Sequence, residues 1–208
     1  MGDLFGNPVV SEFHKLYMSD HNTWTTTFWR GVRIVKCPFD LWIYQEIIHE
    51  TKPELIIECG TFLGGSALYF ANLMDLGNWD NGLMGGTVLT IDVAEYSEPR
   101  SQHVRITYLR GSSVSPAIFV AARSLAKVAK RVMVVLDSDH SAEHVFNEMS
   151  LYSDLVTPGC YMVVEDTDND GPRAAVAKWM ESDDRFIQDR SREKNLLTLF
   201  PGGWLKRK

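Results

Sequence analysis

The sequence is poor in cysteine, and it has no long apolar run. Its three cysteines, Cys37, Cys59 and Cys160, lie far apart among 208 residues and form no C-x-x-C pair. This spacing is typical of reduced, mostly buried thiols in a cytoplasmic protein. No segment has the length of a transmembrane helix, and the first residues lack the apolar core of a signal peptide. We therefore expect a cytoplasmic protein with no membrane partner.

Basic residues are also few. The chain has 21 Lys and Arg against 27 Asp and Glu, a formal net charge of −6. Broad binding to a phosphate backbone needs a concentrated basic surface, so no nucleic-acid partner is expected. The basic cluster at residues 206–208 is predicted to be a solvated tail. The apolar content of 45% is typical of a globular domain with a sizeable core.

The order of apolar runs predicts the fold class. Five runs rich in β-branched residues alternate with helical or loop segments, which indicates a doubly wound, Rossmann-like α/β sheet with helices on both faces. The predicted strands, some with their turns, are residues 55–58, 87–93, 106–113, 131–140 and 160–167, and residues 196–200 are expected to form a final strand. The predicted helices are residues 40–49, 66–74, 116–130, 141–155 and 172–180, and residues 77–86 are expected to form a glycine-rich loop.

An aromatic-rich segment, residues 1–38, precedes this predicted domain of residues 39–208. Residues 9–18 have the spacing of an amphipathic helix. The segment either covers one edge of the core or forms a lid or a wall of the substrate pocket. Its aromatic side chains are Phe13, Tyr17, Trp24, Phe28 and Trp29.

A glycine turn after the first predicted strand is the clearest candidate binding element. The strand ends at Glu58, and a helix begins near Ser66. Strand, glycine turn and helix bring backbone amides and a helix N-terminus close to a ligand. The pattern E-x-G-x-x-x-G resembles the first motif of S-adenosylmethionine-dependent methyltransferases, and an ordinary turn without a ligand remains the alternative. The expected cofactor-binding residues are Glu58, Gly60, Thr61, Gly64, Gly65 and Ser66.

Polar residues also follow the other predicted strands, at the sheet edge where ligands bind. Asp92 ends the second strand and is suited to the two hydroxyls of a ribose. The alternative for Asp92 is a helix cap or a solvated strand end. Ser112 and Ser113 follow the third strand and could line an adenine.

Acids after the fourth and fifth strands form a candidate metal site. Asp139, Glu165 and Asp166 come from two consecutive strand ends, and three hard oxygen ligands suit Mg²⁺. Asp137 is expected to face the cofactor and is an alternative metal ligand. Zinc is disfavoured because no Cys or His cluster has the ligand spacing. The remaining alternative is metal-free, with these acids capping helices.

The residue after Asp139 is a candidate catalytic base. His140 could take a proton from a substrate hydroxyl, because the pKa of an imidazole lies near neutral pH. The alternative is a structural histidine, with a bound cation alone acidifying the hydroxyl. His144, one helical turn further, is predicted to lie on the surface.

Taken together, four motifs resemble the cephalosporin hydroxylase/rhamnosyl O-methyltransferase family. They are residues 36–46 (KCPFDLWIYQE), 57–67 (IECGTFLGGSA), 136–140 (LDSDH) and 164–167 (VEDT). The resemblance covers about residues 24–200. It implies a methyltransferase fold that binds S-adenosylmethionine and Mg²⁺, with the family's metal ligands falling on Asp139, Glu165 and Asp166.

Two functions of different class follow. The first is an Mg²⁺-dependent O-methyltransferase acting on a hydroxyl of a sugar or small natural product, with Asp139 and His140 at the reacting centre. The second is a non-catalytic, cofactor-binding partner subunit of a tailoring complex. An iron-dependent hydroxylase is disfavoured, because the six histidines offer no evident facial triad. Homo-oligomerisation is left open.

Overall fold

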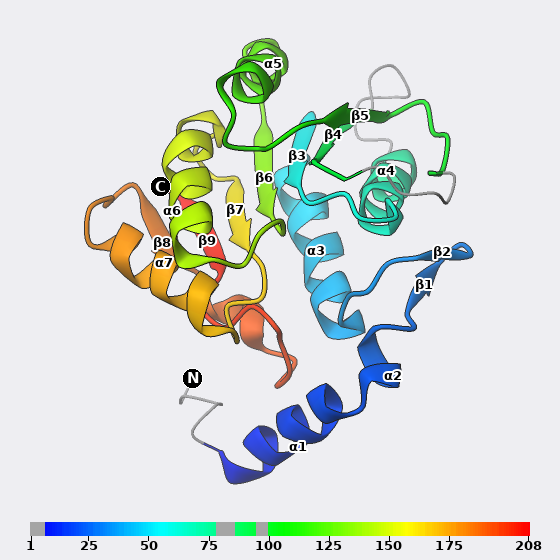
Figure 1. Ribbon diagram of the computed structural model, residues 1–208, viewed down its shortest axis with the longest axis vertical. Coiled ribbons are helices and arrows are strands. Elements are labelled where there is room, and N and C mark those ends of the chain that lie inside the picture. Colours follow the sequence, from blue (N-terminus) through cyan, green and yellow to red (C-terminus); the bar gives the residue numbers. More distant parts are fainter. Residues whose placement is uncertain (1–6, 78–85, 95–99) are drawn as a thin grey trace.

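The computed structural model describes residues 7–77, 86–94 and 100–208, and it contains a seven-stranded sheet flanked by helices (Figure 1). The strand order is β5-β4-β3-β6-β7-β9-β8; β9 pairs antiparallel with β7 and with β8, and the other pairs are parallel. The fold is therefore the predicted doubly wound α/β sheet. The strands are β3 (Leu55–Cys59), β4 (Thr87–Asp92), β5 (Ile106–Arg110), β6 (Val132–Leu136), β7 (Tyr161–Val164), β8 (Phe186–Gln188) and β9 (Trp204–Arg207).

Strand β3 lies inside the sheet, between β4 and β6, and both of its faces are buried. Leu55, Ile57 and Cys59 pack into one half of the core, whereas Ile56 packs into the other. This alternation follows from the two-residue period of a strand, and it explains why the run contains no polar residue before its end. Since β3 pairs with β4 on one side and β6 on the other, the direction of the crossovers changes here. Ligands of such sheets bind at this point, outside the carboxyl ends of the strands.

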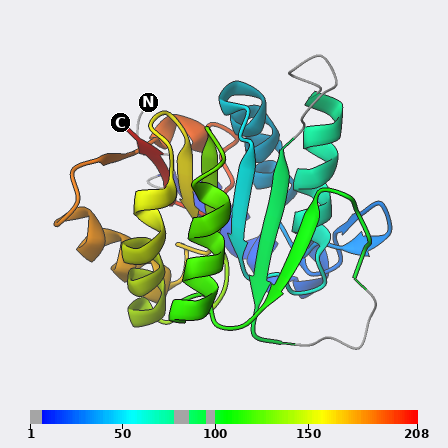
Figure 2. The ribbon, with the colours of Figure 1, turned by 90° about the horizontal axis from the view of Figure 1, so that it is seen from above.

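The five predicted helices of the domain are all present, and they form the two outer layers. Helices α5 and α6 cover one face of the sheet, with α7 packed in the same half of the core, and α3 and α4 cover the other face (Figure 2). Proline at the first turn starts both α3 and α5, as its fixed φ favours. These helices are α3 (Pro38–Thr51), α4 (Gly65–Gly77), α5 (Pro116–Ala126), α6 (Ala142–Tyr152), followed by the short η2 (Ser153–Leu155), and α7 (Asp170–Met180).

Two predictions for the C-terminal part are wrong. Residues 196–200 form no strand: Leu196 has a φ of 66°, and the Asp40 carboxylate accepts a hydrogen bond from the Leu199 amide at 2.9 Å. The run is apolar because Leu199 and its neighbours pack into the core on the α3 side. Residues 206–208 are not a solvated tail, because Lys206 and Arg207 belong to β9, between β7 and β8. A short 3₁₀ helix, η3 (Arg190–Glu193), precedes this region.

The N-terminal segment begins with the predicted amphipathic helix, α1 (Pro8–Ser19), which lies at the opposite end of the molecule from α5 (Figure 1). It continues through α2 (His21–Trp24) and a small hairpin of β1 (Phe28–Trp29) and β2 (Val32–Arg33). Residues 78–85 of the predicted glycine-rich loop lie outside the described residues. None of the helices formed by the described part of the chain is long and apolar enough to cross a bilayer.

Candidate active site

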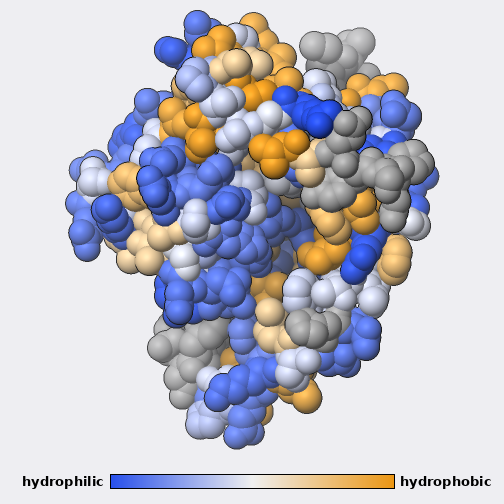
Figure 3. Space-filling model, viewed as in Figure 1, coloured by the Kyte–Doolittle hydropathy of each residue, from blue (hydrophilic) through white to orange (hydrophobic). Residues whose placement is uncertain are grey.

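A cavity of about 750 Å³ lies at the carboxyl ends of the parallel strands. Figure 3 shows this face of the molecule hollowed near its centre. The cavity is lined by the turn after β3, the ends of β4, β5 and β7, and the loop after β6. Residues 33–37 of the N-terminal segment also line it, as do Leu199 and Phe200. Its volume is within the range of pockets that enclose a ligand of drug or cofactor size.

The turn after β3 depends on glycine at two positions. Gly60 has a φ of +102°, and a Cβ there would lie 1.7 Å from the carbonyl oxygen of Asp137. A Cβ on Gly65 would lie 2.3 Å from the carbonyl oxygen of Arg33. The turn therefore packs directly against the loop after β6 on one side and the N-terminal segment on the other.

This contact leads to a test at Gly60. The Gly60→Ala variant should lose about 2–5 kcal/mol of unfolding free energy, because it combines a steric clash with an unfavourable φ. Gly159→Ala is the matched control, since its φ is +86° but a Cβ there would meet nothing within 4 Å. That control should lose only about 1 kcal/mol. Urea unfolding measures both, and equal losses would show that the contact with Asp137 does not matter.

Glu58 lies behind the turn rather than in the cavity. Its side chain is fully buried, and its Oε2 accepts a hydrogen bond from the Thr90 hydroxyl at 2.6 Å. Its Oε1 has no hydrogen-bond partner among the described residues. Burial raises the pKa of this carboxyl to about 7. The unpaired oxygen is an acceptor that no described donor satisfies, and it lies behind the turn rather than in the cavity.

Asp92 lines the cavity and also holds the turn in place. Its Oδ2 accepts from the amides of Thr61 and Phe62 at 3.1 and 2.8 Å, and its Oδ1 accepts from the Ala94 amide at 2.8 Å. The two amides use both lone pairs of Oδ2, whereas Oδ1 retains one lone pair that can accept from a ligand hydroxyl. The helix cap proposed as an alternative for Asp92 is absent, because the amides it accepts belong to two turns.

A buried acid that was not predicted from the sequence, Glu148, lies behind the part of the cavity lined by Ser112 and Ser113. Glu148 is fully buried and accepts hydrogen bonds from the hydroxyls of Ser113 and Ser138. His144 contacts both Glu148, at 3.3 Å, and Ser113, at 3.1 Å. The prediction that His144 lies on the surface is therefore wrong: it lines the cavity, because the side of α6 that carries it packs toward β5.

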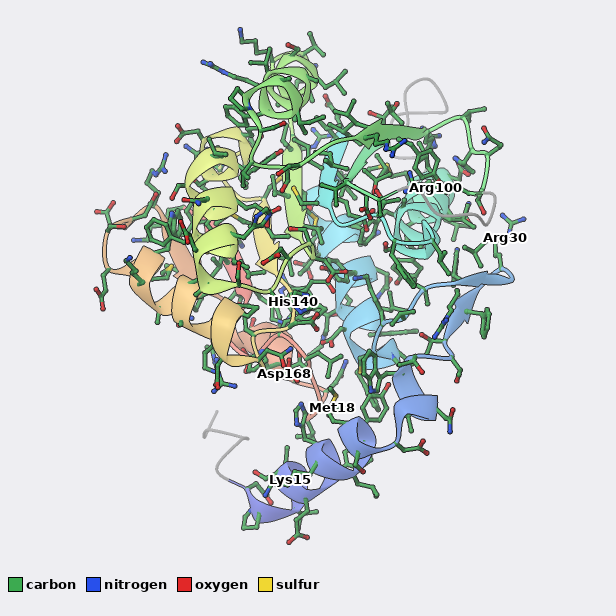
Figure 4. The ribbon with its side chains drawn as sticks, viewed as in Figure 1. Lys15, Met18, Arg30, Arg100, His140 and Asp168 are labelled. Carbon is green, nitrogen blue, oxygen red and sulfur yellow. The ribbon has the colours of Figure 1, made fainter. Side chains whose placement is uncertain are left out.

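In the same cavity, three side chains converge in a cluster suited to a metal ion. Asp137, His140 and Asp166 each place one ligand atom within 4.8 Å of the others. His140 Nε2 lies 3.1 Å from Asp166 Oδ2 and 3.8 Å from Asp137 Oδ1, and Figure 4 shows His140 near the centre of the molecule. Hydrogen bonding to these two carboxylates raises the pKa of His140 to about 10. A protonated His140 thus lies between Asp137 and Asp166, and a divalent cation could offset the charge of these two acids at the same place.

Asp139 does not join this cluster. Its Oδ1 accepts a hydrogen bond from the Ser141 amide at 2.7 Å, in the loop that leads into α6. The bond to Ser141 lowers the pKa of the Asp139 carboxyl. Asp137, two residues earlier, instead places its carboxylate beside Asp166. Of the two candidate acids after β6, Asp137 and not Asp139 is therefore the one that lies beside Asp166.

Glu165 is buried and is held by two donors. Lys36 Nζ lies 2.6 Å from Glu165 Oε2 and 2.8 Å from Asp137 Oδ2. The Tyr44 hydroxyl donates to Glu165 Oε1 at 2.7 Å. Lys36 and Tyr44 both lie in the motif at residues 36–46, but nothing in that motif showed that they reach the acids.

This sheet, with a glycine turn after β3 and a cluster of acids in the same cavity, defines a Rossmann-like methyltransferase fold. Solved structures of CmcI share it. A CmcI structure with SAH has a TM-score of 0.66 and 23% identity, covering 88% of this chain and 83% of that chain. One with Mg and SAM has a TM-score of 0.64 and 20% identity, covering 88% and 77%.

The chain belongs to the rhamnosyl O-methyltransferase/CmcI family, whose model matches residues 21–208. The rhamnosyl O-methyltransferase of Mycobacterium leprae is 35% identical over 215 residues, which cover 96% of this chain and 91% of that protein. That of Mycobacterium tuberculosis strain H37Rv is 38% identical over 175 residues, covering 81% and 69%. The family resemblance predicted from the four motifs is thus confirmed.

Proposed function

We propose that this protein is a Mg²⁺-dependent O-methyltransferase that moves a methyl group from S-adenosylmethionine to a hydroxyl of a sugar or small natural product. The observation that carries the proposal is that one cavity joins the glycine turn and Asp92 to the cluster of Asp137, His140 and Asp166. Family membership supports it, since the matching relatives are rhamnosyl O-methyltransferases. A non-catalytic partner subunit would not need this cluster beside the proposed cofactor site.

The cofactor would lie along the glycine turn. Asp92, which lines the cavity, suits a ribose hydroxyl, and the Glu58 carboxyl behind the turn would favour the ammonium group by its charge rather than by direct contact. Ser112, Ser113 and His144 would line the adenine. The cavity also receives residues 33–37, so we propose that part of the segment 1–38 forms a wall of the site rather than a separate unit.

The metal would be held by Asp137 and Asp166, with Glu165 adjoining them. Two or three carboxylates with remaining positions for water and substrate are the ligand set that Mg²⁺ prefers. When bound, the ion would lower the pKa of the acceptor hydroxyl and stabilise negative charge on its oxygen. We assign the first ligand to Asp137 because the Asp139 carboxylate is engaged at Ser141.

His140 is the proposed base. It lies between Asp137 and Asp166, where it can take the proton of a hydroxyl held at the cluster. Its pKa is raised by those two carboxylates. Neutralising their charge with a cation would bring the pKa back toward its usual range, so that the imidazole could accept a proton. The cavity walls would position the methyl group and the acceptor oxygen in line.

The direct test is methyl transfer to rhamnose-bearing glycosides from S-adenosylmethionine in the presence of Mg²⁺, followed by mass spectrometry of the product. We expect the glycoside to gain one methyl group. Calorimetry with S-adenosylhomocysteine gives an independent readout. A protein that binds neither this compound nor S-adenosylmethionine would not be the proposed enzyme.

The ribose assignment gives a separate prediction. Asp92→Ala should weaken binding of S-adenosylhomocysteine by about 5–150-fold, through loss of charge-assisted hydrogen bonds. Because Asp92 also holds the turn, calorimetry should include the analogue that lacks both ribose hydroxyls. The variant should bind this analogue about as well as the wild type does. Equal losses for the two compounds would show that Asp92 acts only through the turn.

A further inference from the structure

Residue Lys36 reaches the acidic cluster from a part of the chain far from it in sequence. It belongs to the N-terminal segment, 101 residues before Asp137 and 129 before Glu165, and its side chain is 3% exposed. The preceding residue, Val35, has a φ of 53°. A β-branched residue in this left-handed region is strained, and such strain is kept only where the surrounding structure requires it. The backbone is thus bent at the point that directs Lys36 into the site.

The contacts of Lys36 are those of a counter-cation. Its ammonium lies within 2.8 Å of Asp137 and 2.6 Å of Glu165, two carboxylates of the proposed metal site. Burying carboxylates side by side is costly unless a positive charge offsets them. Tyr44, which donates to the other oxygen of Glu165, is neutral and cannot supply that charge.

We propose that Lys36 balances the negative charge of Asp137 and Glu165 and positions these two acids at the proposed metal site. Its ammonium holds Asp137 and Glu165 together before a metal binds. Folding of the N-terminal segment therefore assembles the metal site. Each carboxylate oxygen that accepts from Lys36 retains a second lone pair, so the contact leaves both acids able to ligate a cation. The proposal makes two statements. The first, that Lys36 holds Asp137 and Glu165 together in the metal-free protein, needs no methyltransferase activity. The second, that both acids can still ligate a cation, rests on the proposed function.

Thermal unfolding of the full chain in excess chelator tests the first statement. Lys36→Met keeps the length of the side chain but removes its charge, and it should lower the unfolding midpoint by about 6–20 °C, because it breaks a buried ion pair. Lys36→Arg, which keeps the charge, should lose less. The matched control is Lys194→Met, since Lys194 pairs with Glu46 at 2.6 Å near the surface. It should shift the midpoint by less than about 4 °C.

A double-variant cycle separates the charge effect from simple packing. If Lys36 offsets the charge of Glu165, the loss caused by Lys36→Met should be smaller in a Glu165→Gln background. An equal loss in both backgrounds would show that Lys36 only fills space. If Lys36→Met does not fold in chelator, recovery of folding in the double variant supports the proposal, and failure to recover overturns it.

Addition of Mg²⁺ tests the second statement. In the Lys36→Met protein a divalent cation would supply a larger share of the positive charge. Mg²⁺ should therefore raise its midpoint by at least about 3 °C more than it raises that of the wild type. An equal or smaller rise would overturn this part. If Mg²⁺ shifts neither protein, the proposed metal dependence fails, and the measurements in chelator still decide the role of Lys36.

Discussion

The Asp137→Asn variant is expected to lose Mg²⁺-dependent methyl transfer by at least about a hundredfold, while its affinity for S-adenosylhomocysteine stays nearly unchanged. The reason is that Asp137 and Asp166 place oxygens within 4.8 Å of each other and of His140. Asparagine keeps an oxygen atom but removes one negative charge, which weakens the binding of the cation. Turnover measured against Mg²⁺ concentration, together with calorimetry using Mn²⁺ or Mg²⁺, checks this result.

Asp139→Asn is the matched control, two residues along the same loop. Its carboxylate accepts from the Ser141 amide, so the substitution should cost at most about 1 kcal/mol of stability and little turnover. The reverse pattern, with Asp139→Asn inactive and Asp137→Asn active, would assign the ligand to Asp139. Full activity of the wild type in excess chelator would rule out a functional metal at either position.

The second large effect is expected at His140. Replacing it by alanine should lower the turnover number by about 10²–10⁴-fold, because the proposed base for the acceptor hydroxyl is lost. The affinity for S-adenosylhomocysteine should not change, since His140 contacts Asp137 and Asp166 and is not among the residues proposed to bind the cofactor. Single-turnover kinetics with saturating acceptor measures the chemical step apart from binding.

His144→Ala provides the comparison for His140. It lies one helical turn further on, contacts Ser113 and Glu148, and lines the wall proposed for adenine. Its loss should weaken cofactor binding more than it slows the chemical step. If the loss in His140→Ala is small and is recovered at higher pH, the hydroxyl is acidified by the cation alone and His140 is not the base.

Local chemistry was enough to predict much of this protein. A run buried on both faces is almost wholly apolar, so β3, β6 and β7 were recognisable. The turn at Gly60 was recognisable because a backbone with a φ of +102° and a carbonyl oxygen against it accepts no side chain. Local apolar character misled at residues 196–200, where side chains such as Leu199 fill the core without forming a strand.

The identity of the converging side chains depended on the tertiary structure. Asp137 and Asp139 are the same residue type two positions apart, and only the path of the loop after β6 places one beside Asp166 and the other at Ser141. Lys36 and Glu165 are 129 residues apart, so no local pattern could join them. Local sequence was enough to predict the five parallel strands from β3 to β7, the glycine turn and the acids at the sheet edge, because backbone sterics and burial act over a few residues. It missed β8 and β9. The packing of distant segments decided which acids meet and which cation lies between them, because charges interact through space rather than along the chain.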